Sequence, residues 1–276
     1  MRIAVFAVSL FVVTKCKDVN FDYFVLAQTN PYAKCFSANG DLRCEVPNKT
    51  PQWTIHGLWP SRIRGKGPFY CQSPEYKFQK SRLKPIELEL EKNWPNVYPD
   101  KSKYSLWKHE WEKHGSCTIG TPGFQHEINY FNISLGLHET FNIERALKAS
   151  RVAPSMTSNY SLSDIILSLK NQLSSGKEVK LICVSNPSTG QVMLLEIELC
   201  IDKQLRTISC SDEMLSFSFD RNGKPGSCPE TGIAYIPAQS TANIGPRKGC
   251  HNFKWNIGCL MLSFYSLYEL FFNHLR

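Results

Sequence analysis

The chain has 276 residues, of which 42% are hydrophobic and 20% charged, and its formal net charge is +8. This composition is sufficient for one large globular domain, which we expect, or for two small ones. The excess of Lys and Arg is scattered among aromatic and polar stretches, which excludes a basic tail. A basic chain favours polyanionic partners such as nucleic acid, although many secreted proteins share the property.

The N-terminus has the pattern of a short signal peptide. Met1 and Arg2 precede an apolar run over 3–13 that is too short to span a bilayer. We expect residues 1–16 to be removed and the protein to be secreted and extracellular. The alternative is a buried first strand.

Hydrophobic periodicity and turn residues predict strands at both ends of the main domain and helices between them. The second strand is expected to end at Trp59 and Pro60. Proline, serine and glycine punctuate the helical region, and helices between two sets of strands indicate an α+β fold. We expect strands over 21–28, 52–58, 178–184 and 191–201, and helices over 85–93, 105–114, 124–135, 138–149 and 162–173.

After about Pro237 the sequence becomes irregular. We expect a domain over 17–237 and a C-terminal extension over 238–276. Residues 260–275 are apolar, but Glu269 interrupts them and the run is short for a membrane span, so no stable membrane association is expected.

The chain has 11 cysteines, and removal of Cys16 with the leader leaves an even set of ten. An even number in a secreted chain favours disulfides, whereas zinc sites need close pairs such as C-x-x-C, which are absent. We therefore expect disulfides and no metal. Asn132 and Asn159 begin sequons and are candidate glycan acceptors.

Two segments contain candidate catalytic residues. His56 lies within WTIHGLWP, and His109, Glu110, Lys113 and His114 lie together within KHEWEKHGSC. Taken alone, His56 could equally be a core or surface histidine, and the second cluster could be a solvated helix face. On a helix, Glu110 and His114 would share one face, where the carboxylate could orient the imidazole.

The second segment resembles a zinc motif only superficially. H-E-x-x-H sites need two histidines four residues apart, whereas His109 and His114 are five apart and rotated by about 140° on a helix. Two histidines with pKa values of about 6.5 can instead serve as general base and general acid. Cleavage of RNA by its own 2'-hydroxyl needs only these two groups and a cation such as Lys113 for the phosphorane.

The segments WTIHGLWP and HEWEKHGSC resemble the two active-site segments of the ribonuclease T2 family, plant type. The resemblance covers Phe21 to about Cys228, including WPN at 94–96 and IELC ending at Cys200. It implies a central antiparallel sheet flanked by helices and stabilised by disulfides. It also implies metal-free and cofactor-free cleavage of single-stranded RNA through a 2',3'-cyclic phosphate.

The resemblance also implies a role for each site residue. His114 corresponds to the general base, His56 to the general acid, and Glu110 with Lys113 to groups that stabilise the phosphorane. The expected substrate-binding residues are His109 for phosphate, Trp59 for base stacking, and Gln28. Trp59 could alternatively be a core tryptophan.

The same resemblance implies four disulfides and leaves two cysteines unassigned. Cys250 and Cys259 have no counterpart and could pair with each other. The sequence departs from the family pattern at Asn30, where a tryptophan is usual, and at Ser61, where Asp or Asn often reads the base. The implied pairs are Cys35–Cys44, Cys71–Cys117, Cys183–Cys228 and Cys200–Cys210.

Two plant subgroups compete for the biological role. The basic pI of about 8.9 and the four expected bridges slightly favour a self-incompatibility ribonuclease, which would have a protein partner. An intact His109 favours an S-like enzyme for phosphate recovery or defence. A third alternative is an inactive ribonuclease-like binding or storage protein, whose mark would be a missing catalytic histidine, and none is missing. We expect a monomer.

Overall fold

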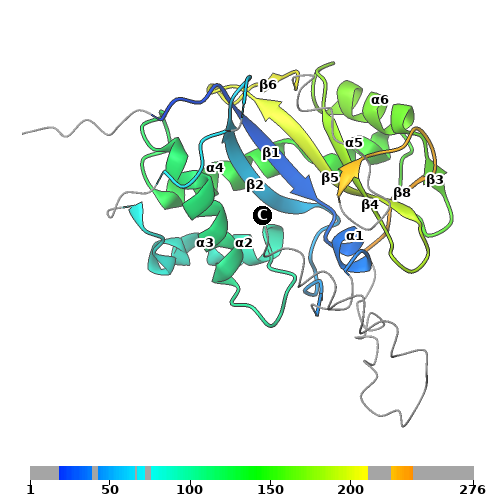
Figure 1. Ribbon diagram of the computed structural model, residues 1–276, viewed down its shortest axis with the longest axis horizontal. Coiled ribbons are helices and arrows are strands. Elements are labelled where there is room, and N and C mark those ends of the chain that lie inside the picture. Colours follow the sequence, from blue (N-terminus) through cyan, green and yellow to red (C-terminus); the bar gives the residue numbers. More distant parts are fainter. Residues whose placement is uncertain (1–18, 39–42, 66, 72–75, 211–224, 239–276) are drawn as a thin grey trace, which may run out of the picture. The chain divides into compact units, whose positions relative to one another are not determined.

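A computed structural model describes residues 19–38, 43–65, 67–71, 76–210 and 225–238 (Figure 1). All of them belong to the unit Met1–Thr241. The predicted leader, Cys250, Cys259 and all but the first residue of the predicted extension lie outside the described residues.

A mainly antiparallel sheet forms the centre of the fold, with the strand order β2-β1-β5-β4-β7. The described part of the chain also contains shorter strands that extend this sheet, and one of them, β8, pairs in parallel with β5. The α+β architecture expected from the sequence is therefore confirmed. The strands are β1 (Tyr23–Thr29), β2 (Thr54–Ser61), β3 (Asn159–Tyr160), β4 (Lys180–Ser185), β5 (Val192–Ile201), β6 (Thr207–Ile208), β7 (Gly226–Ser227) and β8 (Ile233–Ala234).

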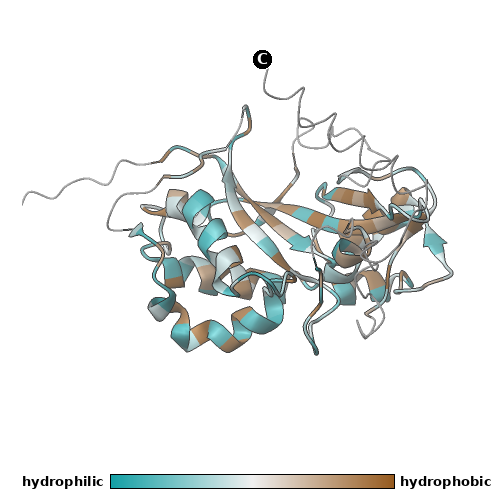
Figure 2. Cartoon of the chain, turned by 60° about the horizontal axis from the view of Figure 1, so that its bottom comes forward, coloured by the Kyte–Doolittle hydropathy of each residue, from teal (hydrophilic) through white to brown (hydrophobic). Residues whose placement is uncertain are grey.

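Helices pack around this sheet, and α4 runs behind β1 and β2 (Figure 1). In Figure 2 apolar residues are concentrated along the central strands, whereas the helices mix apolar and hydrophilic residues, as amphipathic helices on a core do. The helices are α1 (Pro31–Phe36), η2 (Lys80–Ile86), α2 (Glu87–Asn93), α3 (Tyr104–Lys113), η3 (Gly115–Thr118), α4 (Glu127–Thr140), α5 (Ile143–Ala149) and α6 (Leu162–Gln172).

The two faces of the sheet are buried against different sets of residues. Leu26, Leu58 and Ile197 face the larger core, which contains the tryptophans of α3. Val25 and Cys200 face the other side, where Trp59 packs against them. Because side chains alternate along a strand, the register Val25↔Trp59 and Val25↔Cys200 places these three residues on one face.

The alternation breaks in β2 at the predicted catalytic histidine. Gln28 pairs with Ile55 and Ala27 pairs with Gly57, so His56 is an extra residue opposite an uninterrupted β1. Ile55 and Leu58 both enter the core, although a regular strand would send residues three apart to opposite faces. A bulge of this kind changes the direction of one side chain, and here it turns His56 away from the core.

Several predicted boundaries were wrong. The strand β2 continues through Trp59 and Pro60 to Ser61. A proline is tolerated there because β2 is an edge strand of the sheet. The helix expected to begin at Pro85 begins at Glu87, after a 3-10 segment. The segment between the first two expected strands contains a helix that was not predicted, α1, whose N-terminus is capped by the Asn30 side chain.

The helical region is also divided differently from the prediction. A break was expected between 135 and 138, beside Gly136, but α4 runs through this glycine to Thr140, and Asn142 caps α5 instead. A Cβ at Gly136 would meet no atom within 4 Å. The glycine therefore lies at an open position of the helix surface, where it does not end the helix.

Four disulfides join the described residues, and they are the four pairs that the resemblance implies. The bridge Cys71–Cys117 connects the segment after β2 to η3, immediately beyond the helix with the predicted catalytic residues. A closed loop of this length restricts the unfolded chain and favours the native arrangement of both ends. The other bridges are Cys35–Cys44, Cys183–Cys228 and Cys200–Cys210.

Candidate active site

His56 lies on the face of the sheet that carries Val25, Trp59 and Cys200, here called the cleft face. A carboxylate on β5 holds its side chain. Its Nδ1 lies 2.5 Å from Glu196 Oε2 on β5, and Trp94 Nε1 donates to its backbone oxygen at 3.0 Å. The His56 side chain is 33% exposed, whereas that of Glu196 is only 7% exposed. The carboxylate therefore holds the inner nitrogen, and the other ring nitrogen remains available to the cleft.

Glu110 reaches the same face from α3. Its Oε2 accepts a hydrogen bond of 2.9 Å from Trp59 Nε1, and its residue is 2% exposed. Gly57 makes this contact feasible, because a Cβ there would lie 2.0 Å from Trp59 Nε1 and 2.4 Å from Glu110 Oε2. Burial raises the pKa of Glu110, while His56, the Trp59 hydrogen bond and Lys113 oppose the rise.

His114 follows α3 as its C-terminal cap, where its backbone N–H donates to Glu110 O at 3.1 Å. The helical spacing would allow the Glu110 carboxylate to orient this imidazole, but the carboxylate accepts from Trp59 instead. Among the described residues, His114 Nδ1 has no hydrogen-bond partner. Burial lowers the pKa of His114 to about 3, and Lys113, His109 and His56 add to this effect.

Trp59 contacts both histidines. Its ring centroid is 5.1 Å from that of His56, in an edge-on arrangement, and 5.4 Å from that of His114, at an interplanar angle of 33°. Trp59 is half-buried, so part of its indole remains accessible beside the two imidazoles. This position differs from that of Trp94, Trp107 and Trp111, which are fully buried.

Lys113 and His109 complete the predicted cluster on the same side of α3. Both lower the pKa of His114 through their charge, and the charge of His56 also lowers the pKa of His109. His109 is exposed, and burial, followed by Lys113 and His56, lowers its pKa. The structure therefore brings His56, Glu110, Lys113, His114, His109 and Trp59 together.

Phe69 is a cleft residue that sequence reasoning missed. Its ring lies 5.6 Å from that of His114, edge-on, and the Lys113 ammonium lies 5.7 Å from its centroid. Tyr70 N donates to Lys113 O at 2.9 Å, and the Cys71–Cys117 bridge follows directly. The only sequence signal for this placement is the neighbouring cysteine.

A small cavity of about 40 Å³ lies beside His56, between β1, β2 and the segment after α2. Thr29 and Lys34 line it from the β1–α1 region, and Tyr98 lines it from the opposite wall. The Lys34 ammonium lies 5.7 Å from the Tyr98 ring centroid, and burial lowers the pKa of Lys34. Neither Thr29 nor Lys34 was predicted as a site residue.

Gln28, which the resemblance assigned to substrate binding, does not lie in this cleft. It has no exposed surface and pairs with Ile55, so it faces α4 on the other side of the sheet. Its Nε2 donates to Phe141 O at 2.9 Å, and its Oε1 lies 2.6 Å from His138 Nδ1. The assignment was wrong because the bulge puts His56 and Gln28 on opposite faces.

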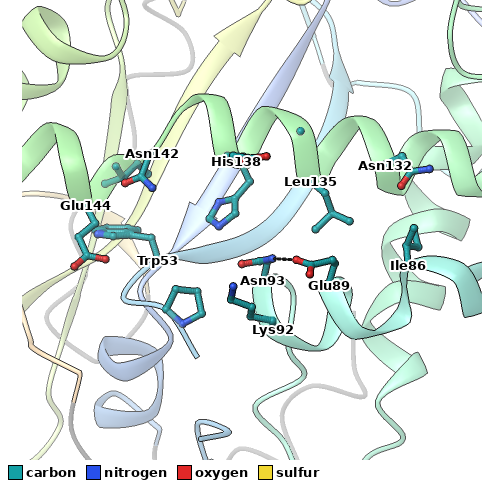
Figure 3. Close-up of a pocket in the computed structure, with 14 residues that line it drawn as sticks. Trp53, Ile86, Glu89, Lys92, Asn93, Asn132, Leu135, His138, Asn142 and Glu144 are labelled. Carbon is teal, nitrogen blue, oxygen red and sulfur yellow. Dashed lines mark hydrogen bonds between the residues drawn. The ribbon is translucent and has the colours of Figure 1, made fainter. Parts of the chain in front are cut away.

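His138 lines a larger cavity of about 530 Å³ between α2 and α4, which Figure 3 shows. Trp53 and Leu135 contribute apolar surface there, and Glu89 accepts a hydrogen bond from Asn93 at its floor. None of the predicted catalytic residues lines this cavity. In the described part of the chain, no three His, Cys, Asp or Glu side chains are arranged to hold a metal ion.

Comparison with known proteins identifies the class of protein to which this fold and this cleft belong. The sequence model of the Ribonuclease T2 family matches residues 21–210. The chain is 36% identical to Ribonuclease Oy of Magallana gigas over 71% of this chain and 91% of that protein. It is 33% identical to Ribonuclease S-3 of Pyrus pyrifolia over 82% of this chain and 96% of that protein.

Solved structures agree with this similarity. The Japanese pear S3-RNase covers 77% of this chain and 99% of its own, with a TM-score of 0.63 and 31% identity. RNase NT in complex with 5'-AMP covers 75% of this chain and 97% of its own, with a TM-score of 0.62 and 27% identity. The chain belongs to the ribonuclease T2 family. It is an endoribonuclease of the T2 type.

Proposed function

We propose that the protein cleaves single-stranded RNA without a metal ion, through a 2',3'-cyclic phosphate, with His114 as general base and His56 as general acid. The observation that carries this proposal is that both imidazoles lie against the Trp59 ring, at 5.1 and 5.4 Å. A base and an acid on either side of one phosphate are what in-line transesterification requires.

The pKa values of the two histidines differ in the direction that these two roles require. Burial lowers the pKa of His114 to about 3, so its imidazole is neutral near pH 7 and can accept the 2'-hydroxyl proton. Burial has the largest effect on the pKa of His56 and lowers it, but Glu196 and Glu110 together outweigh burial, and the pKa is raised overall. His56 therefore keeps the proton that the departing 5'-oxygen takes up.

The remaining residues of the cleft support the charged intermediate and the substrate. The ammonium of Lys113 faces the charge that develops on the phosphorane. Glu110, whose pKa burial raises, lies on the same face, where it holds the Trp59 side chain through their hydrogen bond and helps to stabilise the phosphorane. His109 is exposed at the edge of the cleft, where it can bind phosphate, and the free face of Trp59 can stack a base.

The reaction can be tested with DNA oligonucleotides that contain a single ribonucleotide. The purified protein should cut only on the 3' side of the ribonucleotide, in the presence of EDTA, because only that position has an attacking hydroxyl. The first product should end in a cyclic phosphate, one water lighter than the hydrolysed product by mass spectrometry. Cleavage of an all-DNA oligonucleotide, or its loss on adding EDTA, would overturn the proposal.

The roles of the histidines need separate variants. His56→Ala and His114→Ala should each lower kcat/KM on RNA by about 10²–10⁴, the usual contribution of a general acid or base. His126→Ala is a suitable control, because His126 lies at the start of α4 and outside the cleft. Near-normal activity in either cleft variant would remove that histidine from the mechanism.

We propose that the enzyme is secreted, that it is a monomer, and that Asn132 and Asn159 carry glycans. Both asparagines are exposed, on α4 and β3, and no helix of the described residues is long and apolar enough to cross a membrane. Glycosidase treatment of protein from a eukaryotic host should remove a glycan from each asparagine and lower the mass of the protein accordingly. Light scattering should give one chain per particle.

The biological role has two candidates. Similarity to Ribonuclease S-3 of Pyrus pyrifolia and the basic pI support self-incompatibility, with a protein partner in the pistil. The intact His109 supports an S-like role in phosphate recovery or defence. Expression confined to pistils would support the first role, whereas induction by phosphate starvation would support the second. An inactive binding protein would show no cleavage in the experiments above.

A further inference from the structure

The buried carboxylate of Glu196 is the partner of His56, and no sequence motif contains it. Glu196 lies in the middle of β5, where it pairs with Thr29 of β1 on the cleft face. Its Oε2 is 2.5 Å from His56 Nδ1, across a sequence separation of 140 residues. A carboxylate that is 5% exposed needs a charged or hydrogen-bonding partner, and His56 supplies both.

Other charged groups also act on His56, among them Glu198 of β5. Glu110 of α3 favours its protonated form, whereas Lys34 of α1 opposes it. His109 and His114 also interact electrostatically with His56. Glu196 has the largest of the effects that favour the charged imidazole, through charge and through the hydrogen bond.

A second buried glutamate on the same strand shows that the contact is specific. Glu198 lies two residues further along β5 on the same face, and its Oε2 lies 3.2 Å from Lys180 Nζ. It has the same exposure as Glu196, 5%, but its ion pair is with Lys180, and it acts on His56 through its charge alone. Lys180 thus compensates one carboxylate, and His56 is placed to compensate the other.

We propose that Glu196 is the positioning residue of the general acid: it fixes Nδ1 of His56, directs Nε2 to the departing 5'-oxygen, and keeps the ring protonated while His114 is neutral. This inference rests on the proposed function, because it takes His56 as the acid. A merely structural Glu196 would affect the stability of the fold and leave the pH dependence of catalysis unchanged.

Glu196→Gln removes the charge and keeps the shape. Because burial of His56 remains, the pKa of His56 should fall below its ordinary value of about 6.5. The descending limb of the pH profile of kcat/KM reports this acid, so it should move to lower pH by one unit or more. At pH 7 cleavage of a dinucleoside monophosphate should decrease by severalfold, approaching tenfold per unit of this shift once the pKa lies well below the assay pH.

The leaving group separates loss of the acid from general damage. A uridine 3'-(4-nitrophenyl phosphate) substrate expels nitrophenolate, which needs no proton from the enzyme. Glu196→Gln and His56→Ala should both retain activity on this substrate to within about tenfold, while His114→Ala should lose it, since the base is still required. Equal losses of Glu196→Gln on both substrates would overturn the proposal.

Glu198→Gln is the matched control, with the same substitution on the same strand and at the same burial. It should move the descending limb much less than Glu196→Gln does and change kcat/KM on the dinucleotide by less than about threefold, since its carboxylate pairs with Lys180 and acts on His56 through charge alone. An equal shift of the limb in both variants would mean that the charge of the strand, and not the contact with His56, sets the protonation. That result would contradict the proposal.

Proton NMR titration of His56 tests the inference even if Glu196→Gln folds poorly. In the unmodified enzyme, the pKa of His56 should lie above its ordinary value, and a value below it would overturn the proposal. If Glu196→Gln folds with unchanged pKa and pH profile while His56→Ala is inactive, Glu196 has no positioning role but the proposed function stands. Full activity of His56→Ala on RNA would instead overturn both.

Discussion

Two histidines on opposite faces of the sheet have nearly the same local geometry. His56 Nδ1 lies 2.5 Å from an oxygen of Glu196, and His138 Nδ1 lies 2.6 Å from an oxygen of Gln28. In both cases the partner belongs to a central strand. In both cases burial is the largest influence on the pKa of the ring, and it lowers that pKa.

The outcome differs because one partner is charged and the other is neutral. Glu196 raises the pKa of His56 above its ordinary value, whereas the pKa of His138 beside Gln28 falls to about 4. The Gln28 amide donates to Phe141 O, so its oxygen faces His138 and accepts from Nδ1. The comparison teaches that burial alone produces a neutral histidine, and that a buried acid needs an anion at its second nitrogen.

Removal of each ring gives the largest expected contrast. His56→Gln should lower kcat/KM on RNA by about 10²–10⁴, whereas His138→Gln should remain within about twofold of the unmodified enzyme. The reason is that His138 faces the cavity of Figure 3 and not the cleft. Steady-state cleavage of a dinucleoside monophosphate measures both variants, and a large loss of kcat/KM in His138→Gln would contradict the separation of the two faces.

Gly57 lies next to His56, and Gly136 lies two residues before His138. Replacing the first glycine should affect activity, whereas replacing the second should affect only stability. Gly57→Ala should lower kcat/KM by roughly tenfold or more, because its Cβ would displace Trp59 from Glu110. Gly136→Ala meets open space in α4, so it should leave activity unchanged and raise the free energy of unfolding by about 0.5–1 kcal/mol. Urea denaturation with activity assays tests both, and an active Gly57→Ala would show that the Trp59–Glu110 bond is dispensable.

Gln28→Glu would give His138 the same type of partner as His56. The pKa of His138, followed by NMR, should rise by about one unit or more, because an anion now faces Nδ1. The variant also loses the donor to Phe141 O, so the free energy of unfolding should fall by about 1–3 kcal/mol. An unchanged pKa in a folded variant would mean that the charge of the partner does not decide protonation. Catalysis should not change.

A further expected effect is on stability in acid. The pKa of His138 is about 4 in the folded chain and about 6.5 in the unfolded chain, so the unfolded state binds more protons between these values. Stability that depends on neutral His138 is therefore complete above pH 6.5 and decreases as the pH falls toward 4. His138→Gln should flatten this part of the stability curve, and His114 should still contribute a slope in the same direction.

The sequence located most of the cleft because the relevant residues lie in two short segments. His109, Glu110, Lys113 and His114 follow one another along α3 and its cap, and their spacing alone determines their proximity. The strands and helices of the domain were predicted with errors mainly at their ends, since capping by Asn30 and Asn142 and the continuation of α4 through Gly136 depend on tertiary packing.

The sequence by itself determined the chemical groups of this enzyme: two histidines, a carboxylate and an ammonium in two segments, with cysteines in a number that suits disulfides. Only the tertiary structure decided which face each group occupies. The bulge in β2 sends His56 to the cleft and leaves Gln28 against α4, and strand pairing brings Glu196 to His56 from 140 residues away. Local spacing contains no information about such pairings, because they depend on the register between strands distant in sequence.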